Sequence, residues 1–136
     1  MAELRLVLAT RTAELARLAD EAEAFATACG LDAGPIYRLL TVLDEIVTNV
    51  VSHAGLDAAS TIEVQLRERE RGLDVTVEDA GAPFDPLSDA RAPPLAGNVE
   101  ERPVGGLGIF LVQRLASDVA YLRTPDGRNR LSFRVA

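Results

Sequence analysis

The stretch that most constrains the fold is residues 39–55, LLTVLDEIVTNVVSHAG, which has the apolar spacing of an amphipathic helix. At about 100° per residue, its apolar side chains gather on one half of the helix and leave Glu45 and Asn49 outside that half. These two residues are four positions apart and therefore lie one turn from each other. A carboxylate and a carboxamide placed in this way can accept a proton and bind a hard cation, or they can be two solvated residues on an exposed face.

The composition indicates a single domain, covering residues 1–136, that does not bind nucleic acid. With 136 residues, 48% of them apolar, the chain is long enough for one hydrophobic core. A net charge of -7 argues against a protein that binds a phosphate backbone. All 14 basic residues are arginine, so a cationic contact with a phosphate has to come from arginine or from backbone amides. Without a membrane-spanning run, a secretion signal or a second cysteine, we expect a cytoplasmic protein.

Hydrophobic periodicity over the rest of the chain predicts strands and two more helices. The first helix is expected to begin with Thr10 or Thr12 as its N-cap and to run to about Cys29, and the last is expected to follow the glycines at 105–108. Short turns between strands predict antiparallel hairpins. Period-two alternation predicts strands at 3–9, 60–67, 73–78, 119–123 and 131–135.

This order of elements predicts an α/β (α+β) two-layer sandwich. A mixed, mostly antiparallel sheet is expected to be covered on one face by three helices. Residues 86–104 are rich in proline and have no hydrophobic period, which predicts a lid or binding loop.

Two further segments carry groups suited to a ligand. Asp79 and Gly81 follow a strand, where a buried carboxylate can accept a hydrogen bond from an exocyclic amine and a glycine lets a flat ring approach the backbone. Gly105-Gly106-Leu107-Gly108 begins a helix, which directs several N–H groups to one place and suits phosphate oxygens, although plain turns have the same composition. Phe84, in a stiff Pro-Phe-Asp-Pro turn, is expected to be a core anchor and not a ligand contact.

Taken together, Glu45-x-x-x-Asn49, Asp79-x-Gly81 with the following Pro-Phe-Asp-Pro turn, and the glycines at 105–108 resemble the ATP-binding motifs of the GHKL superfamily. The closest resemblance is to the bacterial anti-sigma-factor serine kinases, which residues 47–54 and 126–131 also look like. The resemblance covers essentially the whole chain from residue 4. It implies the Bergerat ATP-binding fold, with ATP and Mg²⁺ as ligands.

The resemblance also implies roles for individual residues. Asn49 would bind Mg²⁺, Glu45 would be the general base, and Asp79 would bind adenine with Gly81 beside the ring. The resemblance identifies no arginine for the γ-phosphate, and Arg102 is expected there in preference to Arg91 because it lies three residues before the glycines. The amides that would meet the phosphates are those of Gly105, Gly106, Leu107 and Gly108.

The same resemblance implies the partners. The substrate would be a serine on a STAS-type anti-anti-sigma protein, and the second activity would be the sequestration of a sigma factor. A homodimer is a further expectation, whereas direct contact with nucleic acid or a membrane is not expected.

Other functions within the superfamily stay open. A non-catalytic ATP-binding switch that docks a partner is the main alternative, and the presence of Glu45 favours the kinase because a pure binder has no need of a base. The catalytic domain of a sensor histidine kinase would act on a histidine in a preceding helical hairpin. An ATPase of the DNA gyrase or MutL type would need a following transducer domain, so both are less favoured.

Overall fold

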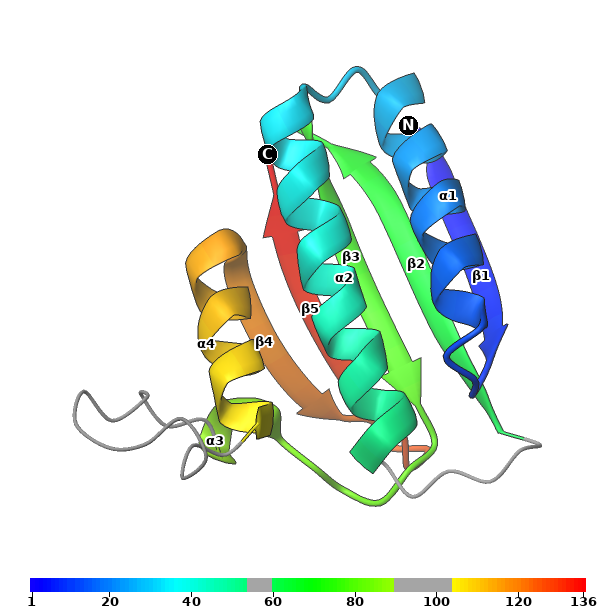
Figure 1. The fold of residues 1–136 in the computed structure, drawn as a ribbon, viewed down its shortest axis with the longest axis vertical. Coiled ribbons are helices and arrows are strands. Elements are labelled where there is room, and N and C mark those ends of the chain that lie inside the picture. Colours follow the sequence, from blue (N-terminus) through cyan, green and yellow to red (C-terminus); the bar gives the residue numbers. More distant parts are fainter. Residues whose placement is uncertain (54–59, 90–103) are drawn as a thin grey trace.

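The computed structural model of the protein describes residues 1–53, 60–89 and 104–136, and these form two layers (Figure 1). One layer is a five-stranded sheet in the order β1-β2-β3-β5-β4, and the other consists of helices on one face of that sheet. The strands are β1 (Glu3–Ala9), β2 (Thr61–Arg69), β3 (Gly72–Asp79), β4 (Ser117–Arg123) and β5 (Asn129–Val135). The helices are α1 (Glu14–Ala28), α2 (Ala33–His53), α3 (Pro86–Asp89) and α4 (Val104–Leu115).

All neighbouring strands of the described sheet pair in antiparallel fashion. In β3 the alternate residues Leu73, Val75 and Val77 face the helices and are at most 2% exposed. The same inward set ends at Asp79, which lies opposite Asn129 of β5 in the register. The expected α+β sandwich with a mostly antiparallel sheet and three covering helices, α1, α2 and α4, is confirmed (Figure 1).

Helix α2 lies along the middle of the sheet and supplies much of the core (Figure 1). Its apolar side chains Leu39, Leu43, Ile46 and Val47 are at most 3% exposed, as the spacing of the sequence predicts. The opposite side of the helix stays closer to solvent, so Glu45 and Asn49 are only half-buried.

The predicted cap of α1 was wrong. Ala13 occupies the N-cap position and makes no side-chain capping hydrogen bond, so neither Thr10 nor Thr12 serves as the cap. The chain turns at residues 10–13 before the helix begins, and the side chain of Glu14 in the first turn accepts a hydrogen bond from the Ala9 amide at 3.4 Å. The Glu14 and Leu15 amides donate to the carbonyl oxygens of Arg11 and Thr12, each at 3.1 Å, so the backbone of the turn satisfies the first donors of the helix.

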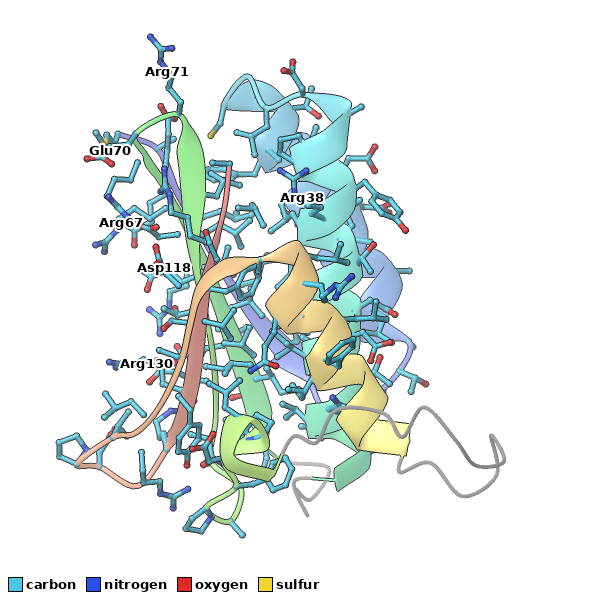
Figure 2. All side chains as sticks on the ribbon, turned by 90° about the vertical axis from the view of Figure 1, so that its left-hand side faces the viewer. Arg38, Arg67, Glu70, Arg71, Asp118 and Arg130 are labelled. Carbon is cyan, nitrogen blue, oxygen red and sulfur yellow. The ribbon has the colours of Figure 1, made fainter. Side chains whose placement is uncertain are left out.

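The face of the sheet away from the helices carries oppositely charged side chains in pairs (Figure 2). Arg134 donates to the Asp74 carboxylate at 3.1 Å, and Arg69 donates to the same carboxylate. The hydrogen bonds from Arg69 and then Arg134 hold the pKa of Asp74 below its ordinary value. Such exposed pairs add little stability, but they keep an open sheet face polar.

None of the helices in the part of the chain that the structure describes has the length and apolar character needed to cross a bilayer.

The first residue of β3 has no room for a side chain. A Cβ built on Gly72 would lie 2.6 Å from the carbonyl oxygen of Val135, a backbone atom that cannot move without disturbing β5. We therefore expect Gly72→Ala to lower the free energy of unfolding by about 1–3 kcal/mol in a urea titration. Gly34→Ala is the control, because its Cβ would lie 3.6 Å from the flexible Arg38 guanidinium. Equal stability of the two variants would contradict this account.

Candidate functional site

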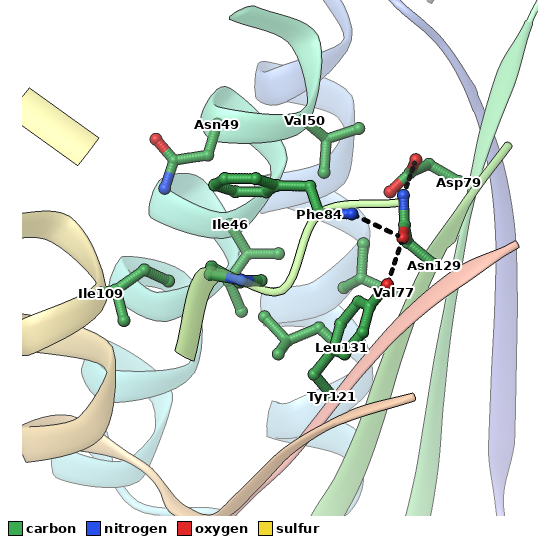
Figure 3. Close-up of a pocket in the computed structure, with 11 residues that line it drawn as sticks. Ile46, Asn49, Val50, Val77, Asp79, Phe84, Ile109, Tyr121, Asn129 and Leu131 are labelled. Carbon is green, nitrogen blue, oxygen red and sulfur yellow. Dashed lines mark hydrogen bonds between the residues drawn. The ribbon is translucent and has the colours of Figure 1, made fainter. Parts of the chain in front are cut away.

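A pocket lies between α2, α4 and the ends of β3 and β5, with about 490 Å³ of empty space that includes open solvent at its entrance (Figure 3). Most of its walls are apolar, and its polar side chains come from four different elements, α2, β3, β4 and β5. This combination of apolar walls with a few placed polar groups is typical of small-molecule sites. The pocket is lined by Ile46, Asn49, Val50, Val77, Asp79, Phe84, Pro86, Ile109, Tyr121, Asn129 and Leu131.

Asp79 is the buried acid of this pocket, with 4% of its surface exposed. Its Oδ1 accepts hydrogen bonds from the backbone N–H of Gly81 at 2.8 Å and from Nδ2 of Asn129 at 3.0 Å. Its second oxygen, Oδ2, has no hydrogen-bond partner among the residues that the structure describes. The carboxylate therefore has one oxygen fixed by the protein and one available to a donor in the pocket.

Asn129 is the residue that holds the pocket end of β3 together. Its Nδ2 also donates to the carbonyl oxygen of Ala82 at 2.9 Å. Its Oδ1 accepts from the hydroxyl of Tyr121 at 2.6 Å, from Arg123 at 3.2 Å and from the Phe84 amide at 3.3 Å. Donors and acceptors at opposite ends fix the orientation of the amide, and the segment after β3 is thereby tied to β5.

Sequence reasoning missed Asn129 as a site residue, although a signal was present. Leu131, Phe133 and Val135 alternate on the buried face of β5, so the same period places Asn129 on that face. A buried amide requires partners, which points to a network.

The segment after Asp79 is a stiff turn. Arg123 donates to the carbonyl oxygen of Gly81 at 2.8 Å, and two prolines restrict the backbone on either side of Phe84. The expectation that Phe84 is a core anchor was wrong, because its side chain is 46% exposed and lines the pocket. The turn points the ring into the pocket instead of into the core (Figure 3).

The structure brings Asn49 of α2 into the same pocket as Asp79 (Figure 3). Glu45, one turn earlier, is half-buried but is not among the lining residues. The described residues contain no cluster of three acidic, histidine or cysteine side chains that would make a metal site of protein ligands alone. A single amide oxygen in an open pocket fits Mg²⁺, which keeps several waters and takes its other ligands from substrate phosphates.

The glycine-rich segment lies where the sequence predicts it, at the start of α4. That helix begins at Val104, so Gly105, Gly106, Leu107 and Gly108 fall in its first turns. The first N–H groups of a helix have no acceptor within the helix and carry the positive end of its dipole. Ile109, directly after them, is buried and lines the pocket.

Part of the predicted site lies outside the described residues. Arg91 and Arg102 belong to the segment 90–103, as does most of the loop expected at 86–104. The described part of that loop, Pro86–Asp89, forms the short helix α3.

The contact between Asn129 and Asp79 can be tested by placing a second carboxylate in it. Asn129→Asp would place a second carboxylate at the present 3.0 Å hydrogen bond, and the repulsion should lower the free energy of unfolding by about 2–4 kcal/mol at pH 7. Because protonation relieves that repulsion, the loss relative to the wild type should be smaller at pH 4. Asn129→Leu, which removes the amide without adding a second carboxylate, is the control and should show a smaller difference between the two pH values. Urea titrations at the two pH values measure this, and a pH-independent loss for Asn129→Asp would contradict it.

Comparison with known proteins identifies the family of this chain. Residues 8–135 match the model of the histidine kinase-like ATPase domain. The chain is 35% identical over 100 residues to the serine/threonine-protein kinase BtrW of Bordetella bronchiseptica, covering 71% of this chain and 68% of that protein. Its fold is similar to the crystal structure of the RsbU and RsbW domains of Rv1364c from Mycobacterium tuberculosis, with a TM-score of 0.70 and 14% identity over 98% of this chain, but this chain spans only 32% of that one. The protein therefore belongs to the histidine kinase-like ATPase family, on the GHKL branch that contains the anti-sigma-factor serine/threonine kinases.

Proposed function

We propose that the protein is an ATP-dependent anti-sigma-factor serine/threonine kinase. It would phosphorylate a serine on a STAS-type anti-anti-sigma protein and sequester a sigma factor. The observation that carries this proposal is the meeting of Asp79 and Asn49, from β3 and α2, in one mostly apolar pocket. A nucleoside triphosphate requires a hydrogen-bond acceptor for its base and, at some distance from it, a ligand for the hard cation that accompanies its phosphates.

Base recognition would belong to Asp79. Its Oδ2, to which none of the described residues donates, can accept a hydrogen bond from the exocyclic amine of adenine, while its Oδ1 is held by Gly81 and Asn129. The apolar walls formed by Ile46, Val50 and other lining residues would cover the rest of the base. A buried acceptor discriminates strongly, because a ligand that lacks the donor leaves it unpaired.

The phosphates would lie between α2 and the start of α4. Asn49 would hold Mg²⁺ through its amide oxygen, and the metal when bound would neutralise charge on the phosphates. The amides at the start of α4, Gly105 to Gly108, would donate to phosphate oxygens. Arg102 would supply the cationic contact to the γ-phosphate.

Glu45 would act as the general base. As the hydroxyl oxygen of the substrate serine forms a bond to the γ-phosphorus, the bond from that phosphorus to the bridging oxygen breaks and ADP leaves. The hydroxyl proton passes to the Glu45 carboxylate, which lies one helical turn before Asn49. The half-buried position of Glu45 leaves it accessible to a second protein.

The relative BtrW, named a serine/threonine-protein kinase, supports the transfer activity. A second candidate function is a non-catalytic ATP-dependent switch that docks a partner protein. The observation that favours it is the position of Glu45 outside the pocket lining. Transfer to a partner protein distinguishes the two functions.

Adenine recognition by Asp79 can be tested by reversing one hydrogen bond. In Asp79→Asn the oxygen that bonds Gly81 and Asn129 is kept, while the pocket-facing oxygen becomes an NH₂ donor. We expect the affinity for ATP to fall about 10- to 100-fold, because two donors then face each other. The affinity for inosine triphosphate, which presents an acceptor at the same position, should rise relative to ATP.

Calorimetric titration with ATP, inosine triphosphate and GTP, with and without Mg²⁺, measures this. An Asp79→Asn variant that keeps the wild-type preference for ATP would contradict the role of Asp79. Absence of any ATP binding by the wild type would contradict the proposed function as a whole.

The proposed role of Glu45 predicts different effects of its removal on ATP binding and on phosphate transfer. Glu45→Ala should keep the dissociation constant for ATP within about threefold and lower the rate of phosphate transfer to a STAS-type protein by about 100-fold or more. The control is Asp44→Ala, which removes the same charge from the exposed neighbouring position on α2. Transfer is followed with ATP labelled at the γ-phosphate. A normal rate for Glu45→Ala would exclude it as the base, and no transfer by the wild type in spite of ATP binding would favour the switch.

A further inference from the structure

Phe84 differs from the other exposed hydrophobic residues of the described chain. Single exposed apolar side chains are common on protein surfaces and need no function. Among the large ones here, however, Phe84 alone lines the pocket. The exposed large hydrophobic residues are Met1, Val7, Tyr37, Phe84, Leu111 and Leu122.

The backbone around Phe84 is held in place by hydrogen bonds within the protein. The Phe84 amide donates to Oδ1 of Asn129 at 3.3 Å. Pro83, directly before Phe84, has its own φ angle fixed by the proline ring. Downstream, Oδ1 of Asp85 accepts from the Leu87 amide at 2.9 Å. The ring therefore needs little ordering when something packs against it, which lowers the entropic cost of binding.

The ring lies between the two polar ends of the pocket. In Figure 3 it projects from the turn after β3 toward Asn49 and Ile46 of α2, with Asp79 on its other side. A ligand that reaches from Asp79 to Asn49 has to pass this ring. A nucleotide with its base at Asp79 and its phosphates at Asn49 would lie along this ring, with its base on the Asp79 side.

We propose that Phe84 forms the aromatic wall against which the purine base packs, an inference that rests on the proposed binding of ATP. An aromatic ring stacks on any base, so Phe84 would supply affinity and Asp79 would supply selectivity. Asn129 holds both groups, since it bonds the Asp79 carboxylate and the Phe84 amide at once.

The chain contains no tryptophan, so a single substitution introduces a fluorescent reporter at this position. In Phe84→Trp, stacking of a purine should quench the fluorescence, with a midpoint equal to the dissociation constant for ATP from calorimetry. The control is Tyr37→Trp, an exposed position on α2 that is 12 residues, or about 18 Å along the helix, from Asn49. The control should show no change on ATP addition.

Affinity measurements distinguish the loss of a contact with the base from a general disruption of the site. Phe84→Ala should weaken binding of ATP about 5- to 100-fold, and Phe84→Leu should fall between it and the wild type. Inorganic tripolyphosphate with Mg²⁺, a probe without a base, should bind Phe84→Ala and the wild type within about twofold of each other.

Each outcome decides a different point. Wild-type binding of ATP together with unchanged affinity in Phe84→Ala, or an equal loss for tripolyphosphate, would overturn the aromatic wall and leave the proposed function standing. A wild type that binds neither ATP nor tripolyphosphate would overturn the proposed function and this inference with it.

Discussion

The hydrogen bond between Asp79 and Asn129, 3.0 Å long, joins the ends of two central strands at the mouth of the pocket. It exists because the antiparallel register of β3 and β5 sets these residues opposite each other, both on the face that the helices cover. Both side chains are buried and have lost their contact with water. Each therefore needs a hydrogen-bond partner within the protein, because an unpaired buried polar group costs free energy. The turn that carries Gly81 and Phe84 is built on the remaining bonds of the same amide. The shape of the pocket thus depends on one pairing of strands.

The elements themselves follow from local sequence patterns. Period-two alternation and short turns placed all five strands, with ends within about two residues of those observed, because strand pairing in hairpins is a local matter. The network around Asn129 could not be obtained in this way. Its partner Asp79 is 50 positions distant, and no single-strand pattern contains the register that brings the two together. The buried polar position was visible in the sequence, but its partner was not.

Two local expectations failed because tertiary contacts outweighed them. Thr10 and Thr12 have the chemistry of a helix cap, yet the path of the chain from β1 places Ala13 at that position. Phe84 has the hydrophobicity of a core residue, yet two prolines and the bond to Asn129 direct it to the pocket. Hydrophobicity predicts burial only where the backbone is free to turn the side chain inward.

The layers of the fold divide the proposed tasks. Base recognition would belong to the sheet, through Asp79 and Asn129, whereas Asn49, Glu45 and the start of α4 lie in the helical layer. Phe84 lies in the turn after β3, and its side chain extends toward α2. It therefore lies where the two layers meet over the pocket (Figure 3). A nucleotide bound in the proposed way would contact both layers, and its affinity would depend on how they pack together. Substitutions in the sheet would then change affinity and selectivity, while the chemistry of transfer would depend on the helices, so the two properties are separable by mutation.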